Sequence, residues 1–229
     1  MRILCLQHVP WEGPGSIRAW ARRSGHELTR ALASEAPIAT ASFDWLILLG
    51  GPMGARDEER HPWLRREKQL LRAALDEGKR VLGICLGAQI LAEALGSVVS
   101  RNPEPEIGWF QVRRVEGATL SPFAAVLPAE FTPLHWHRDT FTAPPGAVHL
   151  LRSEACEQQA FARGSRIVGL QFHLEKSGDD TQELLRHGAD DFVEAPFVQR
   201  PEALLWEPGR FERAHRLLDT ILDAIAAVP

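Results

Sequence analysis

The sequence predicts an α/β fold of three layers around a mixed, mostly parallel sheet. Three short runs are apolar at nearly every position and stand directly before glycine, cysteine or histidine, namely residues 45–49, 81–84 and 167–172. Strands that are apolar on both faces are typical of a parallel sheet covered by helices. Helical patterns alternate with these runs along the chain, and that alternation favours an α/β architecture.

Three segments carry the apolar spacing of a helix, at residues 62–77, 86–95 and 211–228. In the first, leucine and alanine recur every three or four positions, Pro62 suits the first turn, and Gly78 suits the end. The second follows the run 81–84 almost directly. The third has the cleanest period, with one apolar face and charged residues elsewhere.

The remaining segments are less regular. Residues 1–6 predict a first strand, and the Gly-Pro-Gly-Ser stretch at 13–16 predicts a turn leading into a helix. That stretch lacks the lysine and the glycine spacing of a phosphate-binding loop. Between 97 and 170, short alternating stretches broken by proline and glycine predict antiparallel strands and loops added to the sheet. Residues 177–210 favour a short helix near 180–188, followed by an irregular surface segment.

Composition and charge bound the class of protein. The chain has 229 residues, which fits one α/β domain over residues 1–229. The formal net charge is −4 with no run rich in lysine or arginine, so nothing favours binding to nucleic acid. No apolar run approaches bilayer length, and no membrane partner is expected. Three widely separated cysteines favour a reducing compartment, with the cytoplasm as the expected location, and Cys5 and Cys156 are predicted to be buried core thiols.

The third cysteine, Cys85, stands in a G-x-C-x-G pattern between a predicted buried strand and a predicted helix. A side chain on such a sharp turn stands clear of the sheet, and the crowded backbone needs small residues two positions away on each side. Gly83 and Gly87 supply them. The unpaired N–H groups of the helix start favour a thiolate, and the N–H of Leu86 is placed to meet a developing oxyanion. Cys85 is therefore the predicted nucleophile.

A base and a carboxylate follow the last buried strand. His173 comes directly after residues 167–172, so it should emerge at the same sheet edge as Cys85, where ligands bind in open α/β sheets. Glu175 is two positions further on and would point to the same side of an extended segment. Its carboxylate would then fix the imidazole tautomer, which predicts a nucleophile, a base and an orienting carboxylate.

A third polar stretch, at residues 135–139, has the H-x-H-x-D form of some metallohydrolases. His135, His137 and Asp139 offer ligand types that suit zinc. Thr140 follows where that pattern usually continues with another histidine, and no second cluster has suitable spacing. We therefore expect a loop whose polar side chains form hydrogen bonds beside the active site, with no metal and no cofactor.

The stretch G-I-C-L-G-A-Q, followed 88 residues after Cys85 by H-L-E, resembles the class I, triad-type glutamine amidotransferases. Likeness extends over about residues 44–175 and is strongest to the free-standing GMP synthase-like subgroup, through the stretches at 50–53, 106–109 and 135–139. The resemblance implies a flavodoxin-like fold and the triad Cys85, His173 and Glu175. It further implies an oxyanion hole from the N–H groups of Gly51 and Leu86, and substrate contacts from Gln89, Trp136 and His137.

One position departs from the family's pattern. Arg138 stands where GMP synthetase-type amidotransferases have glycine, which bears on the substrate loop and leaves the triad unchanged. The Gly51 assignment also has support from the residues themselves. Gly50-Gly51-Pro52 ends a buried strand, and glycine there lets the backbone approach a ligand closely.

The activity implied by the resemblance is hydrolysis of the glutamine side-chain amide through a cysteine thioester, which releases glutamate and ammonia. Because the sequence after this region is short and contains no P-loop, the ammonia would serve an amidation on a separate synthetase subunit. Two alternatives remain open. The same triad would serve a hydrolase of γ-glutamyl peptides or γ-glutamyl amines, and the fold could also serve a non-catalytic binding or regulatory module.

Overall fold

The computed structural model describes residues 1–35, 39–207 and 209–228. Its centre is a nine-stranded sheet with the order β2-β1-β3-β4-β11-β10-β9-β6-β7. Five neighbouring strands are parallel: β2 (Glu27–Leu32), β1 (Arg2–Gln7), β3 (Trp45–Leu48), β4 (Arg80–Ile84) and β11 (Ile167–Leu170). The sheet continues with antiparallel partners: β10 (Ala160–Arg163), β9 (Val148–Arg152), β6 (Val112–Arg114) and β7 (Glu130–Phe131). The mixed, mostly parallel sheet is thus confirmed.

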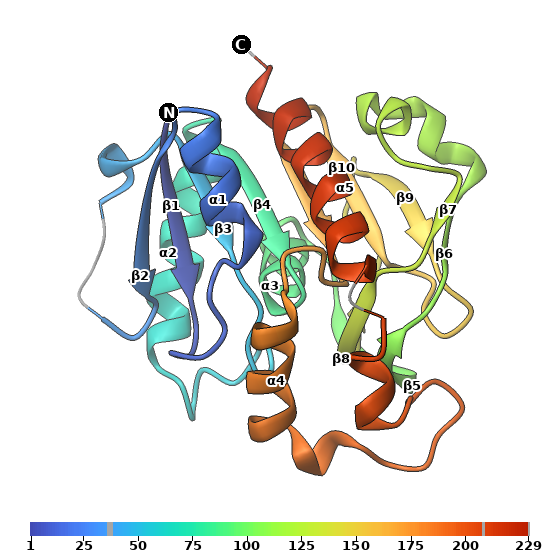
Figure 1. Cartoon of the computed structure of the whole chain (residues 1–229). Coiled ribbons are helices and arrows are strands. Elements are labelled where there is room, and N and C mark those ends of the chain that lie inside the picture. Colours follow the sequence, from blue (N-terminus) through green and yellow to red (C-terminus); the bar gives the residue numbers. More distant parts are fainter. Residues whose placement is uncertain (36–38, 208, 229) are drawn as a thin grey trace.

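Helices cover both faces of the parallel half (Figure 1). α1 (Ser16–Arg23) and α5 (Gly209–Ala226) lie on one face, and α2 (Trp63–Asp76) and α3 (Leu86–Ala94) lie on the other. The strands send alternate residues into two separate cores. Ile47 packs with the α1–α5 side and Leu46 with the α2–α3 side, which explains why these strands are apolar throughout. The three-layer prediction is confirmed.

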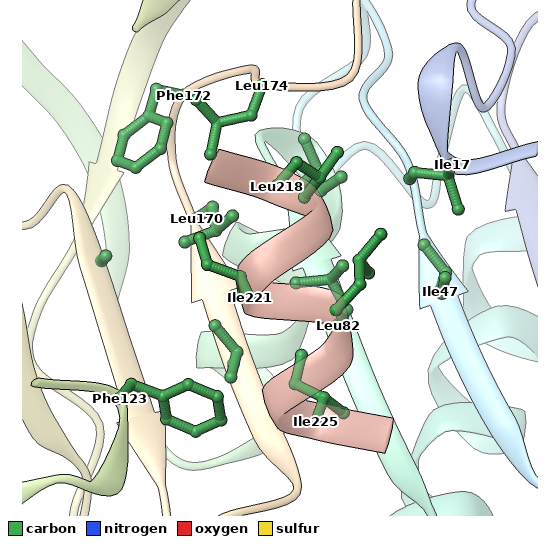
Figure 2. Packing of buried hydrophobic residues seen from close by; sticks show 14 of the residues in the cluster. Ile17, Ile47, Leu82, Phe123, Leu170, Phe172, Leu174, Leu218, Ile221 and Ile225 are labelled. Atoms are coloured by element: carbon green, nitrogen blue, oxygen red, sulfur yellow. The ribbon is translucent and has the colours of Figure 1, made fainter. Parts of the chain in front are cut away.

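The apolar face of α5 packs against the centre of the sheet. Figure 2 shows three of its residues, Leu218, Ile221 and Ile225, facing side chains of the strands beneath them. All three are fully buried or nearly so. None of the described helices has both the length and the apolar character needed to cross a membrane.

The middle of the chain differs in part from the prediction. β5 (Val99–Trp109) and β8 (Leu134–Phe141) form their own antiparallel ribbon instead of joining the main sheet. The stretch 135–139, expected to be a loop, lies inside β8. The alternation typical of a strand was not evident from the sequence, because its buried positions are polar. His135 and His137 are buried, whereas Trp136 and Arg138 are half-buried. A bridge between Leu134 and His173 joins the ribbon to the end of β11.

Two other elements differ from what the sequence predicted. β2 was not anticipated because it is an edge strand of mixed polarity with no buried position. α4 (Gly178–His187) confirms the short helix near 180–188. It begins two residues earlier because Ser177 and Asp180 form a reciprocal capping box. The rest of that segment is only partly irregular surface, since Ile107 of β5 forms backbone hydrogen bonds with Phe197 and Gln199. Short 3₁₀ helices complete the chain: η1 (Thr40–Ser42), η2 (Glu116–Leu120), η3 (Pro122–Ala125), η4 (Ala189–Asp191) and η5 (Pro201–Leu204).

Candidate active site

Cys85 occupies a strained turn between β4 and α3. Its φ is 53°, and among the described residues no other non-glycine residue has a positive φ. Such strain is costly and tends to occur at functional positions. The flanking glycines are required sterically: a Cβ on Gly83 would lie 2.5 Å from the Gly87 carbonyl oxygen, and one on Gly87 would overlap the Leu48 carbonyl. The strand, turn and helix expected around Cys85 are therefore present.

His173 lies at the same edge of the sheet because β11 runs parallel beside β4. The Cys85 N–H donates to the Leu170 carbonyl over 2.8 Å, which fixes the two strand ends relative to each other. His173 Nδ1 lies 2.7 Å from Glu175 Oε1, and both side chains are buried. The second oxygen, Glu175 Oε2, accepts the Leu174 N–H over 3.1 Å. The structure thus brings Cys85, His173 and Glu175 together.

Electrostatics favour a charged histidine at this edge. Burial alone would lower the pKa of His173, but the Glu175 carboxylate and a hydrogen bond with Cys85 outweigh it and raise the pKa to about 10. Burial alone would raise the pKa of Glu175, yet His173 lowers it to about 2. An imidazolium and a carboxylate therefore face each other at neutral pH.

Two charged residues that the sequence analysis did not single out extend this pair. Lys176 Nζ lies 3.6 Å from Glu175 Oε1 and 3.6 Å from Glu12 Oε2. Lys176 is 2% exposed, and burial alone would lower its pKa. The Glu175 and Glu12 carboxylates outweigh burial and raise that pKa. Cations and carboxylates therefore alternate behind His173. Glu12 could have been anticipated from the sequence, because it follows β1 at the carboxyl edge of the sheet.

The two predicted oxyanion donors line one cavity with the cysteine. Gly51 and Leu86 both border it, and neither N–H donates a hydrogen bond to the rest of the described chain. Gly51 cannot be replaced without rearrangement, because a Cβ there would lie 2.9 Å from His8 Cβ and 2.8 Å from Met53 Sδ. Two unpaired N–H groups beside a thiol are what a tetrahedral oxyanion requires.

The cavity measures about 630 Å³ and also holds the predicted substrate residues. Gln89 Nε2 lies 3.3 Å from the Asp139 carbonyl oxygen and 3.3 Å from Gln171 Oε1. The Trp136 carbonyl oxygen lies 3.5 Å from Cys85 Sγ, so the backbone of β8 borders the reacting sulfur. His137 lines the cavity as well, but its Nε2 is engaged by Glu106 at 3.1 Å.

Arg138, which departs from the family's pattern, is paired with Asp191 of η4. Its Nη2 donates to the Asp191 carbonyl over 2.7 Å and its Nε to Asp191 Oδ1 over 3.3 Å. Trp136 Nε1 donates to Asp191 Oδ2 over 2.9 Å. Trp11 stacks on His187 with 3.9 Å between ring centroids. All five of these residues line the cavity, and we refer to them as one wall of it. No sequence signal indicated this wall, because Asp191 lies more than fifty positions from both residues it binds.

Among the described residues, one set of side chains could hold a metal ion, namely Glu106, His135 and His137. Their candidate ligand atoms lie within 4.8 Å of one another. Asp139, the carboxylate of the H-x-H-x-D pattern, pairs instead with Arg101 at 3.0 Å. Glu106 Oε2 also accepts hydrogen bonds from Ser153 and Gln159. The side chains thus form a buried hydrogen-bonded cluster, and the absence of a metal stays a prediction.

Comparison with known proteins gives a consistent result. The sequence profile of the family described as "Glutamine amidotransferase class-I" matches residues 19–192. The glutamine amidotransferase-like protein YfeJ of Salmonella typhimurium is 32% identical over 201 residues, which cover 85% of this chain and 84% of that protein. A GMP synthase of Aeropyrum pernix is 34% identical over 132 residues, or 57% of this chain, but these span only 24% of that enzyme.

Solved structures extend the likeness over the whole chain. A glutamine amidotransferase from Thermotoga maritima superposes with a TM-score of 0.88 and 30% identity, covering 100% of this chain and 99% of that one. A glutamine amidotransferase from Methylobacillus flagellatus gives a TM-score of 0.90 and 28% identity, covering 98% and 94%. The similarity therefore includes α5, which lies beyond the residues 19–192 that the family profile matches.

Proposed function

This chain belongs to the class I glutamine amidotransferase family, and from that premise we propose that it hydrolyses the glutamine side-chain amide through a thioester on Cys85. The observation that carries the proposal is a convergence at one cavity. A cysteine on a strained turn, a histidine bonded to a buried carboxylate, and two unpaired N–H groups meet there. We further propose that residues 1–229 act as one amidotransferase domain, since α5 packs into the core of the sheet.

In the first half-reaction, the Cys85 thiolate attacks the amide carbon and the carbonyl oxygen becomes an oxyanion. The N–H groups of Gly51 and Leu86 stabilise that charge. The oxyanion then collapses, the carbon–nitrogen bond breaks, and the His173 imidazolium gives its proton to the departing nitrogen, which leaves as ammonia. The raised pKa of His173 supports this role because the proton is already on the ring at neutral pH.

In the second half-reaction, neutral His173 takes a proton from water, and the resulting hydroxide attacks the γ-glutamyl thioester. Collapse of this second oxyanion breaks the carbon–sulfur bond. Glutamate leaves, and the thiolate–imidazolium pair is restored. Glu175 stays ionised throughout, and its hydrogen bond to Nδ1 leaves the other ring nitrogen for the reacting groups.

We propose that the ammonia is used by a separate synthetase. The matched GMP synthase of Aeropyrum pernix supports this, because the 132 matched residues span only 24% of that enzyme. A synthetase partner would bind near the cavity, where ammonia is released. Co-purification with such a protein, and stimulation of glutamine hydrolysis by it, would support this assignment.

The size of the cavity favours a second candidate, hydrolysis of γ-glutamyl peptides or γ-glutamyl amines. At about 630 Å³ it has the volume of sites that enclose drug-sized ligands, which exceeds the needs of one amino acid. Trp11, His187 and Asp191 also line this cavity, and we propose that a substituent on the amide nitrogen would contact them. The same acyl-enzyme serves both reactions.

The test is release of ammonia from L-glutamine, and of amine from a panel of γ-glutamyl compounds, by the wild-type protein and a Cys85→Ala variant. Cys85-dependent turnover of glutamine supports the first candidate, and turnover of γ-glutamyl peptides alone supports the second. Near-wild-type turnover by Cys85→Ala would contradict the thioester mechanism. Silence with the whole panel, together with no reaction of Cys85 with a glutamine-like electrophile, would favour a non-catalytic module.

A further inference from the structure

The peptide group that joins Gly50 to Gly51 is hydrogen-bonded, through its carbonyl oxygen, to a buried histidine. His8 Nδ1 lies 2.9 Å from the Gly50 carbonyl oxygen. In a trans peptide the carbonyl and the following N–H point in opposite directions. A donor that fixes the Gly50 carbonyl on the inner side therefore directs the Gly51 N–H to the other side. That side is the cavity, where the Gly51 N–H has no partner in the described chain.

The hydrogen-bond partners of His8 favour a charged ring. His8 Nε2 lies 2.9 Å from Glu67 Oε1. A carbonyl oxygen and a carboxylate can only accept, so both ring nitrogens must carry a hydrogen. Burial alone would lower the pKa of His8, but the Glu67 carboxylate outweighs it and the pKa is raised. His8 is thus an imidazolium with an exposed side-chain fraction of 0%.

Helix α2 fixes this imidazolium in place. Glu67 lies one turn after Trp63 on the same face of the helix. The Trp63 ring stacks on His8 with 5.8 Å between ring centroids and 28° between ring planes. The ring is therefore held by a carboxylate at one nitrogen, a carbonyl at the other and an indole on one face.

From these contacts we propose that His8, held by Glu67, is a positioning residue that aims and polarises the Gly51 N–H at the oxyanion site. This inference rests on the proposed hydrolysis at Cys85. An imidazolium bonded to the Gly50 carbonyl draws electron density through the peptide and makes the Gly51 N–H a stronger donor. The donor is preorganised before substrate arrives, so its alignment costs nothing during reaction. Removing one such donor from an enzyme lowers kcat by about 10²- to 10³-fold.

The test compares wild type with His8→Leu and His8→Asn. Leucine removes the donor to Gly50, whereas the side-chain amide of asparagine can place its nitrogen where Nδ1 stood. We expect His8→Leu to lower kcat by about 10- to 100-fold with KM changed less than about 3-fold, and His8→Asn to recover part of the loss. Affinity for glutamate γ-semialdehyde, which forms a tetrahedral adduct with the thiol, should fall in parallel, while affinity for glutamate is retained.

If His8→Leu does not fold, Glu67→Gln provides the second variant, because it keeps the shape and the acceptor oxygen but removes the charge. It should also lower kcat without raising KM. Unchanged kcat and unchanged aldehyde affinity in every folded variant would overturn the inference. A wild-type protein that turns over no γ-glutamyl compound would instead overturn the proposed function. Crystal structures then decide the inference, since a Gly50–Gly51 peptide rotated in His8→Leu supports it and an unrotated one overturns it.

Discussion

His173 Nδ1 and Glu175 Oε1 lie 2.7 Å apart, in side chains exposed by no more than 1%. A carboxylate at that distance holds a hydrogen on Nδ1 and so determines which ring nitrogen is free to exchange protons. In the proposed mechanism it also stabilises the imidazolium that later gives its proton to the departing nitrogen. The role that we propose for Glu175 is thus electrostatic and orientational, although it does not border the cavity itself.

The substitution Glu175→Gln should lower kcat for glutamine by about 10³- to 10⁴-fold, because the amide favours the wrong tautomer and supplies no charge. The pKa of His173 should fall from about 10, since its main stabilising partner is lost. Steady-state kinetics and NMR titration of the ring measure the two effects. Glu183→Gln is the matched control, because Glu183 forms a surface ion pair with Arg186. A His173 pKa unchanged in Glu175→Gln would contradict this account.

The glycines around Cys85 should be far less tolerant than a loop glycine. Gly87→Ala would press a methyl group into the Leu48 carbonyl, and such overpacking destabilises by typically 1–3 kcal/mol or more. Gly13→Ala is the control, because a Cβ there has no atom within 4 Å. Denaturant unfolding of both variants gives the comparison. Equal free energies of unfolding would show that the turn can relax.

The sequence was most informative where one residue type was required by the backbone. Gly83 and Gly87 could be predicted because a strand-to-helix turn leaves no room for a Cβ, and Cys85 followed from its place between them. His173 and Glu175 followed from the strand before them, since β11 had to be buried and had to end at the ligand-binding edge.

The rest of the site depends on contacts that no local pattern encodes. His135 and His137 looked like loop residues because buried histidines are uncommon. Their burial is made favourable by partners that include Glu106 on another strand. Asp191 is an exposed-type residue in an irregular segment, and its importance comes from Trp136 and Arg138 on a distant strand. Long-range pairing of polar groups, not apolar periodicity, was the missing information.

Stability should fall as the pH drops below about 6.5. His135 is buried with its pKa lowered to about 4, so between pH 6.5 and 4 the unfolded chain takes up a proton that the folded chain cannot. Glu106 and Glu175 have pKa values lowered to about 2, so the stability they contribute above about pH 4.5 is lost as pH falls toward 2. His173 acts at the other end, because its raised pKa makes its contribution present below pH 6.5 and lost as pH rises through 10.

The free energy of unfolding, measured by denaturant titration from pH 3 to 10, tests these directions. His135→Asn should flatten the part of the curve between pH 6.5 and 4, because the group that the folded state excludes from protonation is gone. His61→Asn provides the comparison, since His61 is a partly exposed histidine outside the cluster. A curve that stays flat from pH 7 to 4 in the wild-type protein would contradict the buried, neutral state of His135.

Asp191 should control how substrates larger than glutamine are held. Asp191→Ala removes the acceptor for the Trp136 indole and the carboxylate that pairs with Arg138, so both side chains are held less firmly in the cavity lining. One lost hydrogen bond of about 1 kcal/mol predicts that KM for γ-glutamyl peptides rises about 3- to 10-fold. The pKa of His173, followed by NMR titration, should stay raised, because the Glu175 carboxylate that raises it is untouched.

Two matched variants separate the parts of this effect. Asp191→Asn keeps an acceptor for Trp136 but removes the charge that faces Arg138, so an intermediate KM would assign the remainder to the ion pair. Asp190→Asn changes the exposed neighbour and should behave as wild type. If Asp191→Ala raised KM for glutamine and for γ-glutamyl peptides by the same factor, the wall would act on the shared glutamyl group. Only a larger effect on the peptides places the amide substituent against Asp191, because the glutamyl part is common to both substrates.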